Sequence, residues 1–83
     1  MIKILLSGCN GKMGQVISRL SQQFSSLEIV AGCDLNDTQK NEYPVFTNIK
    51  DCNIPVDVII DFSNPAALNN LLEYSVSRKI PLV

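Results

Sequence analysis

SGCNGKMG, residues 7–14, decides the fold of this chain. It follows an apolar run, residues 2–6, and precedes a segment with helical periodicity, so its glycines lie between a strand and a helix. Because glycine lacks a Cβ and accepts positive φ, such a turn is tight and its N–H groups can point outward. The helix N-terminus adds unpaired N–H donors and about half a positive charge. The stretch therefore predicts a binding site for a pyrophosphate group.

The spacing of these glycines differs from the common dinucleotide-binding fingerprint. That fingerprint is G-x-G-x-x-G, whereas this chain has G-x-x-G-x-x-G, with Asn10 at the place of the second glycine. Alone, the pattern also fits a strand-to-helix turn that binds no ligand. The context favours a ligand site, because a helix with one apolar face follows at once. That face consists of Met13, Val16, Ile17, Leu20 and Phe24.

A second predicted strand, residues 27–33, ends in Asp34. This acid lies about 20 residues after Gly14, where dinucleotide-binding units carry a ribose-binding carboxylate. Such a carboxylate accepts hydrogen bonds from both ribose hydroxyls and repels a 2′-phosphate, and Leu35 supplies no cation to neutralise one. We therefore expect NADH to bind at least as tightly as NADPH, with Lys40 as the residue that would rescue NADPH binding. The alternative role of Asp34 is that of a turn residue at a strand end.

The remaining chain predicts two more strands and a second helix. After a polar loop, residues 35–42, we expect a short strand over 43–47, a helical turn over 49–52 and a central strand over 56–62. Asn64 then provides an N-cap and Pro65 fits the first helical position. The buried stripe expected on this helix consists of Leu68, Leu71, Leu72 and Val76. A last strand begins at residues 80–83.

This succession predicts an α/β fold, a Rossmann-like, doubly wound parallel sheet with strand order 3-2-1-4-5. The first and fourth strands then lie side by side, and the glycine loop and residues 61–64 converge on one crevice. Phe62 either contacts the cofactor or fills the core, and Ser63 either caps the helix or reaches the ligand. Asp61 is interpreted as an anchor for loop N–H groups. Lys12 either contacts phosphate or is solvated.

Composition excludes several classes of function. The chain has 83 residues, 46% of them hydrophobic and 18% charged, with a net charge of −1, which fits one small globular domain. That charge provides no electrostatic basis for binding nucleic acid or an anionic membrane, and no apolar run is long enough to span a bilayer. Three cysteines without a C-x-x-C pair, and no histidine, disfavour a zinc site or disulfide framework and favour the cytoplasm. Cys9 is expected to fill the tight turn; the alternative is a reactive thiol.

Two segments together resemble the dihydrodipicolinate reductase family of diaminopimelate and lysine biosynthesis. They are SGCNGKMGQ, residues 7–15, and DVIIDFSNP, residues 57–65. The resemblance runs from residue 1 to residue 83 and covers the first part of the family's cofactor domain. It implies that Asp34 is the acid at the ribose and that Phe62 and Ser63 lie near the nicotinamide half. The pyrophosphate loop that it implies consists of Gly8, Asn10, Gly11, Lys12, Met13 and Gly14.

The resemblance also implies an oxidoreductase activity. The family transfers a hydride from NADH or NADPH to a cyclic imine or enamine dicarboxylate, and its members form homotetramers through a second domain. Many members carry an arginine after the acid or inside the glycine loop, whereas this chain has Leu35 and Lys12, a departure that bears on NADPH use. The family's catalytic residues are expected beyond Val83, so no catalytic residue is assigned within the chain.

We expect residues 1–83 to be a partial N-terminal dinucleotide-binding domain without the substrate and tetramerisation domain. A strand that opens at the last four residues, with no helix to cover it, is the basis of this expectation. Such a piece would be inactive by itself, and monomeric or dimeric. Two alternatives are the first half of an aspartate or homoserine dehydrogenase and a non-catalytic nucleotide- or coenzyme A-binding domain. A third is a folded piece without a ligand.

Overall fold

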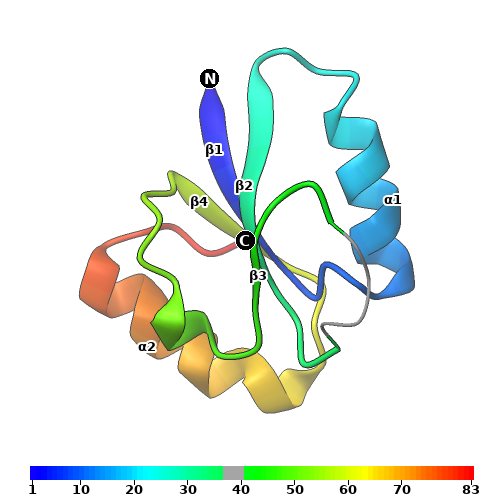
Figure 1. Ribbon diagram of the computed structural model, residues 1–83. Helices are drawn as coiled ribbons and strands as arrows, with labels where there is room; N and C mark the ends of the chain where they lie inside the picture. The colour runs from blue at the N-terminus through cyan, green and yellow to red at the C-terminus, as the bar shows by residue number, and fades with distance from the viewer. Residues whose placement is uncertain (37–40) are drawn as a thin grey trace.

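In the part of the chain that the structure describes, residues 1–36 and 41–83, every strand of the sheet runs parallel to its neighbours. The computed structural model orders the strands β3-β2-β1-β4, which confirms the predicted α/β, Rossmann-like topology (Figure 1). The strands are β1 (Ile2–Ser7), β2 (Leu27–Cys33), β3 (Val45–Phe46) and β4 (Val58–Asp61). A single parallel bridge from Leu82 to Ile59 continues the sheet beyond β4, where the fifth strand was expected.

The register of the sheet aligns the strands at their carboxyl ends. Ser7, the last residue of β1, is paired with Cys33 at the end of β2 and with Asp61 at the end of β4. Three loops therefore start at the same edge of the sheet, side by side. This alignment positions the site, because residues distant in the sequence leave the sheet at one place.

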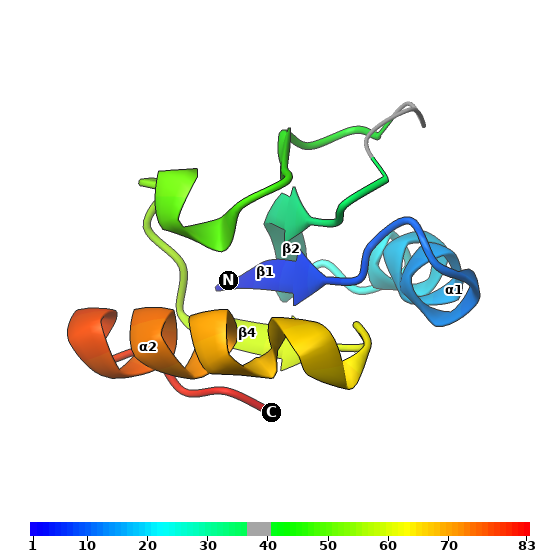
Figure 2. The same cartoon turned by 90° about the horizontal axis from the view of Figure 1, so that it is seen from below.

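The helices lie on opposite faces of the sheet. Helix α1 (Lys12–Ser21) lies on one face, whereas α2 (Leu68–Arg78) and the short 3₁₀ helix η1 (Ile49–Asp51) lie on the other (Figure 2). A second 3₁₀ helix, η2 (Pro65–Ala67), leads directly into α2. The core lies on the α2 face. Its buried residues are Leu5, Ala31, Ile49, Cys52, Ile59, Leu71 and Tyr74.

The buried stripe predicted on α2 was partly wrong. Of the predicted residues, Leu71 is fully buried, whereas Leu72 is 44% and Val76 is 75% exposed. The second buried residue of α2 is Tyr74, which the sequence reasoning missed. It lies one turn after Leu71, and its hydroxyl donates a hydrogen bond to the carbonyl of Cys52 at 2.6 Å. The buried residues of α2, Leu71 and Tyr74, are therefore three positions apart on one side of the helix, and the neighbouring apolar side chains remain exposed.

The apolar face predicted for α1 is also less buried than expected. The helix ends at Ser21, so Phe24 lies in the turn that follows and is 55% exposed. On the helix itself, Met13 and Leu20 are about half exposed. The reason is that α1 packs along β2, where Gly14 alone among its residues is buried, and no other described helix lies on that face. The apolar periodicity identified a helix correctly but overstated how much of it is covered.

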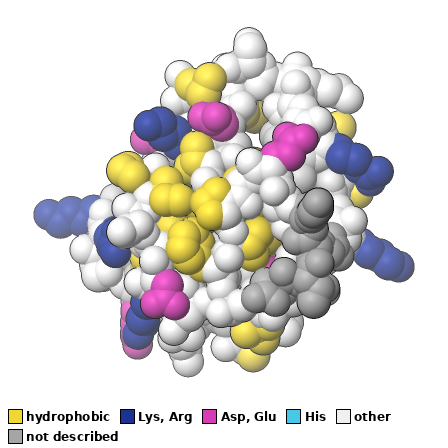
Figure 3. Space-filling model, in the orientation of Figure 1, with side chains coloured by type: hydrophobic (Ala, Val, Ile, Leu, Met, Phe, Trp, Pro, Cys, Tyr) yellow, Lys and Arg dark blue, Asp and Glu magenta, His cyan; other side chains and the backbone are white. Residues whose placement is uncertain are grey.

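Charged side chains do not form a continuous patch on the face shown in Figure 3. Lys and Arg side chains stand apart at its margins, while hydrophobic side chains gather nearer the centre. Among the described residues, neither helix is long and apolar enough to cross a bilayer. Within the same residues, no cluster of three His, Cys, Asp or Glu side chains could hold a metal ion.

Candidate functional site

A cavity of about 540 Å³ lies at the carboxyl edge of the sheet. Its walls come from the loops that follow β1, β2, β3 and β4, together with η2 and the first turn of α2. Among the residues predicted from the sequence, those that line it are Gly8, Gly11, Asp34, Phe62 and Ser63. The predicted convergence of the glycine loop with residues 61–64 is therefore present, and the acid after β2 joins them.

Two of the three glycines in the loop are required by packing. Gly8 has a φ of 78°, and a Cβ on it would lie 2.7 Å from the backbone of Phe62 and Ser63. A Cβ on Gly14 would lie 2.2 Å from the carbonyl oxygen of Gly8. Neither position leaves room for a side chain. Gly8 therefore lets the loop pack against the segment after β4, and Gly14 lets α1 pack against the loop. The loop can adopt this conformation only because both residues lack a Cβ.

Gly11 is different, because packing does not require it to be glycine. A Cβ there would meet only the Gly8 carbonyl oxygen, at an ordinary contact distance of 3.5 Å. Its φ of −76° and ψ of 175° are extended angles that any residue adopts. Gly11 lines the cavity and is the N-cap residue of α1. The missing side chain therefore leaves the helix terminus open to the cavity.

The N-terminus of α1 has no side-chain cap in the described part of the chain. Gly11 provides no acceptor, and the first turn contains no acidic residue. An α-helix leaves the N–H groups of its first turn unpaired and carries a partial positive charge there. This end of the cavity is therefore suited to an anion, and phosphate groups bind helix N-termini in this way.

The segment after β4 satisfies its own N–H groups. The carboxylate of Asp61 accepts hydrogen bonds from the Ser63 N–H at 2.8 Å and from the Ser63 hydroxyl at 2.5 Å. The side chain of Asn64 accepts one from the Ala66 N–H at 3.0 Å, which confirms its prediction as an N-cap. The interpretation of Asp61 as an anchor for loop N–H groups is also confirmed. Phe62, 44% exposed, lines the cavity beside these bonds.

Asp34 is held in place by two backbone groups. Its Oδ2 accepts a hydrogen bond from the Asn10 N–H, and its Oδ1 accepts one from the Asn36 N–H, each at 2.9 Å. Because a carboxylate has about four acceptor positions, both oxygens retain capacity for further donors. Leu35 follows on the cavity wall and is 83% exposed. Lys40, the residue named as a rescuer of NADPH binding, lies outside the described residues.

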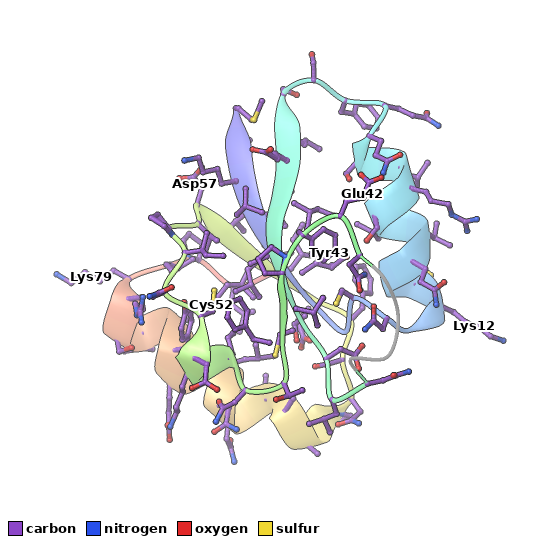
Figure 4. The ribbon with its side chains drawn as sticks, in the orientation of Figure 1. Lys12, Glu42, Tyr43, Cys52, Asp57 and Lys79 are labelled. Carbon is purple, nitrogen blue, oxygen red and sulfur yellow. The ribbon has the colours of Figure 1, made fainter. Side chains whose placement is uncertain are left out.

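The other predicted loop residues do not line this cavity. Asn10 is 5% exposed and bonds to the loop after β2 instead. Gly14 packs beneath the loop. Lys12 and Met13 are exposed on α1, and Figure 4 shows the Lys12 side chain projecting away from the sheet.

Sequence reasoning missed part of the wall. The turn after β3 contributes Thr47 and Asn48. The helix η2 contributes Ala67, and α2 contributes Asn70. The topology could have indicated this contribution, because β3 runs parallel to β2 and therefore ends at the same edge of the sheet. The short strand was predicted, but its contribution to the cavity was not inferred from it.

The thiols near the cavity are not activated. Cys9 is completely buried in the turn, as expected, and burial together with nearby Asp34 raises the pKa of its thiol. Cys33 lines the cavity, and burial, aided by nearby Cys9, raises its pKa to about 11. Because the thiolate is the nucleophilic form, neither group is suited to covalent chemistry at neutral pH.

The sequence matches a family model described as "Dihydrodipicolinate reductase, N-terminus" over residues 2–83. It is 46% identical over 83 residues to a 4-hydroxy-tetrahydrodipicolinate reductase of Clostridium tetani, covering 100% of this chain and 32% of the relative. It is 47% identical over 83 residues to the protein of the same name from Clostridium novyi, covering 100% of this chain and 33% of the relative. The chain thus spans about a third of the length of the curated relatives that it matches.

Two solved structures resemble this chain. A dipicolinate-bound dihydrodipicolinate reductase from a Paenisporosarcina species superposes with a TM-score of 0.83 at 25% identity, covering 99% of this chain and 37% of that one. A dehydrogenase from Chromobacterium violaceum superposes with a TM-score of 0.72 at 20% identity, covering 99% of this chain and 27% of that one. The second likeness shows the fold alone.

Proposed function

The chain belongs to the dihydrodipicolinate reductase family, and from this membership we propose that residues 1–83 bind a reduced nicotinamide dinucleotide in the cavity at the carboxyl edge. The intact protein would use it to reduce 4-hydroxy-tetrahydrodipicolinate, the substrate in the names of its relatives. The observation that carries the proposal is the meeting of an uncapped helix N-terminus and a fixed carboxylate in one cavity.

The fit of a dinucleotide rests on two features of the cavity. At one end, the open space at Gly11 and the donors of the α1 N-terminus suit a pyrophosphate, which is anionic and accepts hydrogen bonds. At the other, Asp34 retains acceptor capacity for two ribose hydroxyls.

The roles of the chain's own residues are binding and orientation. Backbone N–H groups of residues 12–14, in the first turn of α1, would hold the phosphates, and Asp34 would hold the adenosine ribose. Phe62 and Ser63, on the part of the wall formed by the segment after β4, would lie beside the nicotinamide half and fix its orientation. The bound cofactor supplies a hydride. In this proposal, the groups that bind and protonate the substrate belong to parts of the intact protein outside residues 1–83.

The same cavity favours NADH over NADPH. A 2′-phosphate would approach the Asp34 carboxylate, and the two negative charges would repel each other. Leu35, the next residue on the wall, carries no charge that could compensate. We further propose a cytoplasmic setting, which the free thiols at positions 9, 33 and 52 support, and a homotetrameric intact protein.

A fluorescence titration of the intact protein with NADH tests the proposal. The variant Gly11→Val should fold, because extended angles suit valine and the new Cβ has room. Its branched side chain should keep the phosphates from the helix terminus. We expect the dissociation constant for NADH to rise by at least about tenfold, which corresponds to the loss of about one charge-assisted hydrogen bond.

Lys12→Ala is the matched control, since it removes an exposed cation one residue away from Gly11 and outside the cavity wall. It should change the dissociation constant by less than about threefold. Equal NADH affinity in native protein and Gly11→Val would contradict the proposal. A native protein that binds coenzyme A but not NADH would replace it with the alternative of a coenzyme A-binding domain.

A further inference from the structure

Asn10 is the most highly connected side chain in the glycine loop, although it does not line the cavity. Its side-chain N–H₂ donates to the carbonyl of Asn36, and its Oδ1 accepts from the side chain of Asn41 at 3.0 Å. Its backbone N–H donates to Asp34, and its carbonyl accepts from the side chain of Gln15 at 3.0 Å. A buried polar group that is bonded in this way fixes the segments that it joins.

These bonds close a triangle around the carboxylate of Asp34. Asn10 and Asn36 each donate a backbone N–H to one of its oxygens, and the Asn10 side chain ties the two donors to each other. The carboxylate is therefore held from both sides by two segments that cannot separate without losing at least one of these hydrogen bonds. One of those segments is the glycine loop and the other is the loop after β2.

From this triangle we propose that Asn10 is a positioning residue that sets cofactor specificity. It fixes the orientation of Asp34 relative to the glycine loop, and so relates the ribose-binding group to the phosphate-binding groups. The inference rests on the proposed function, because it concerns the dinucleotide in the same cavity. It assigns a role to the residue that replaces the second glycine of the common fingerprint.

The physical consequence concerns the 2′ position of the ribose. A carboxylate locked in one orientation accepts the 2′-hydroxyl without further ordering, which favours NADH. The same carboxylate cannot rotate away from a 2′-phosphate, so its repulsion of NADPH is fully expressed. A carboxylate that is free to rotate would bind NADH less well and tolerate NADPH better. Asn10 therefore acts on the ratio of the two affinities.

The test is a titration of the intact protein with NADH and with NADPH, comparing native protein with Asn10→Ala. The backbone of Asn10 does not have a positive φ, so alanine suits its conformation. We expect the dissociation constant for NADH to rise about tenfold and that for NADPH to change by less than about threefold. Gln15→Ala is the matched control, because it removes a different bond to Asn10 and leaves the triangle intact. It should leave the ratio unchanged.

A double-mutant cycle separates positioning from a general loss of structure. If Asn10 acts through Asp34, then Asn10→Ala should not change the affinity ratio further in the Asp34→Asn background. Asn10→Gly, which introduces the residue of the common fingerprint, provides a second variant in case alanine impairs folding. It should also lower the ratio of NADH affinity to NADPH affinity. If Asn10→Ala raised both dissociation constants by the same factor, the inference would be overturned. The proposed function would still stand, because native protein would still bind NADH. Native protein that binds neither cofactor would overturn both.

Discussion

Two strand-to-helix turns stand side by side at the carboxyl edge of the sheet, and they treat their N–H groups in opposite ways. The turn from β1 to α1 begins its helix at Gly11 with no side-chain cap. The turn from β4 to η2 uses the side chains of Asp61 and Asn64 to accept the N–H groups of Ser63 and Ala66. Both turns line the same cavity.

The difference shows why only one of the turns is suited to an anion. Equal topology gives each turn a helix N-terminus, but a terminus whose donors are already bonded has less to offer a ligand. The first turn has no side-chain cap, so the N–H groups in the first turn of α1 remain accessible to a ligand. The second is stabilised locally and serves as a wall. Function therefore follows from the chemistry of the caps and not from the strand order alone.

Among the variants that test this comparison, the largest effect on stability is expected at Gly14. In Gly14→Ala, the added Cβ would lie 2.2 Å from the Gly8 carbonyl oxygen and 2.6 Å from the Cα of Cys9. Both are backbone atoms, so the loop would have to move away from α1. We expect a loss of at least about 3 kcal/mol in the free energy of unfolding, measured by urea denaturation. Gly11→Ala is the matched control and should lose less than about 1 kcal/mol; similar losses in both variants would contradict the distinction between the two glycines.

The second effect concerns the acid beside the first turn. Asp34→Asn keeps the shape of the side chain but removes its charge and one of its acceptors. We expect the ratio of NADH to NADPH affinity to fall about tenfold, because hydrogen bonds to charged groups contribute about 1.5–3 kcal/mol and the repulsion of a 2′-phosphate is lost. Titration of the intact protein with both cofactors measures the ratio. An unchanged ratio would remove Asp34 from cofactor selection.

The sequence alone supports part of the candidate site and leaves another part unseen. Glycine spacing and the position of Asp34 after a strand were readable because backbone sterics and chain topology act locally. The distinct role of Gly11 was not, because it depends on the distance to the Gly8 carbonyl, which only the folded chain defines. The same holds for Asn10, whose bonds to Asp34, Asn36 and Asn41 reach 24 to 31 residues along the chain.

Helix burial shows a second boundary of the sequence reasoning. Periodicity identified both helices, since an apolar residue recurs about every turn. It could not tell that Tyr74 is buried while Val76 is 75% exposed, because the phase of α2 is set by its packing against the core. Polar anchors were more predictable, as Asp61 and Asn64 bond within two residues of themselves.

A third, smaller effect separates stability from binding in the second turn. Asn64→Ala removes the cap from η2 and should lower the free energy of unfolding by about 1 kcal/mol. Because its side chain serves the chain's own Ala66 N–H, NADH affinity should stay within about twofold of native. Thermal unfolding and an NADH titration on the same preparation check both parts. A large loss of affinity would mean that the second turn also contacts the ligand through this residue.

The smallest effect lies at the far end of the second helix. Among the described residues, positive φ angles occur at Gly8, before α1, and at Lys79, after α2, where φ is 56°. A lysine in the left-handed region is strained, whereas glycine is the usual residue there. Lys79→Gly should therefore raise the free energy of unfolding by about 0.5–1 kcal/mol in urea denaturation. A destabilised variant would show that the lysine side chain contributes more than its backbone strain costs.

The amide resonances of the intact, ¹⁵N-labelled protein test the central claim most directly when inorganic pyrophosphate is added. The uncapped N-terminus of α1 predicts saturable shifts for the amides of residues 12–14. The amides of Ser63 and Ala66, which already donate to Asp61 and Asn64, should shift little. Shifts centred on Ser63 and Ala66, or none in residues 12–14, would contradict the account.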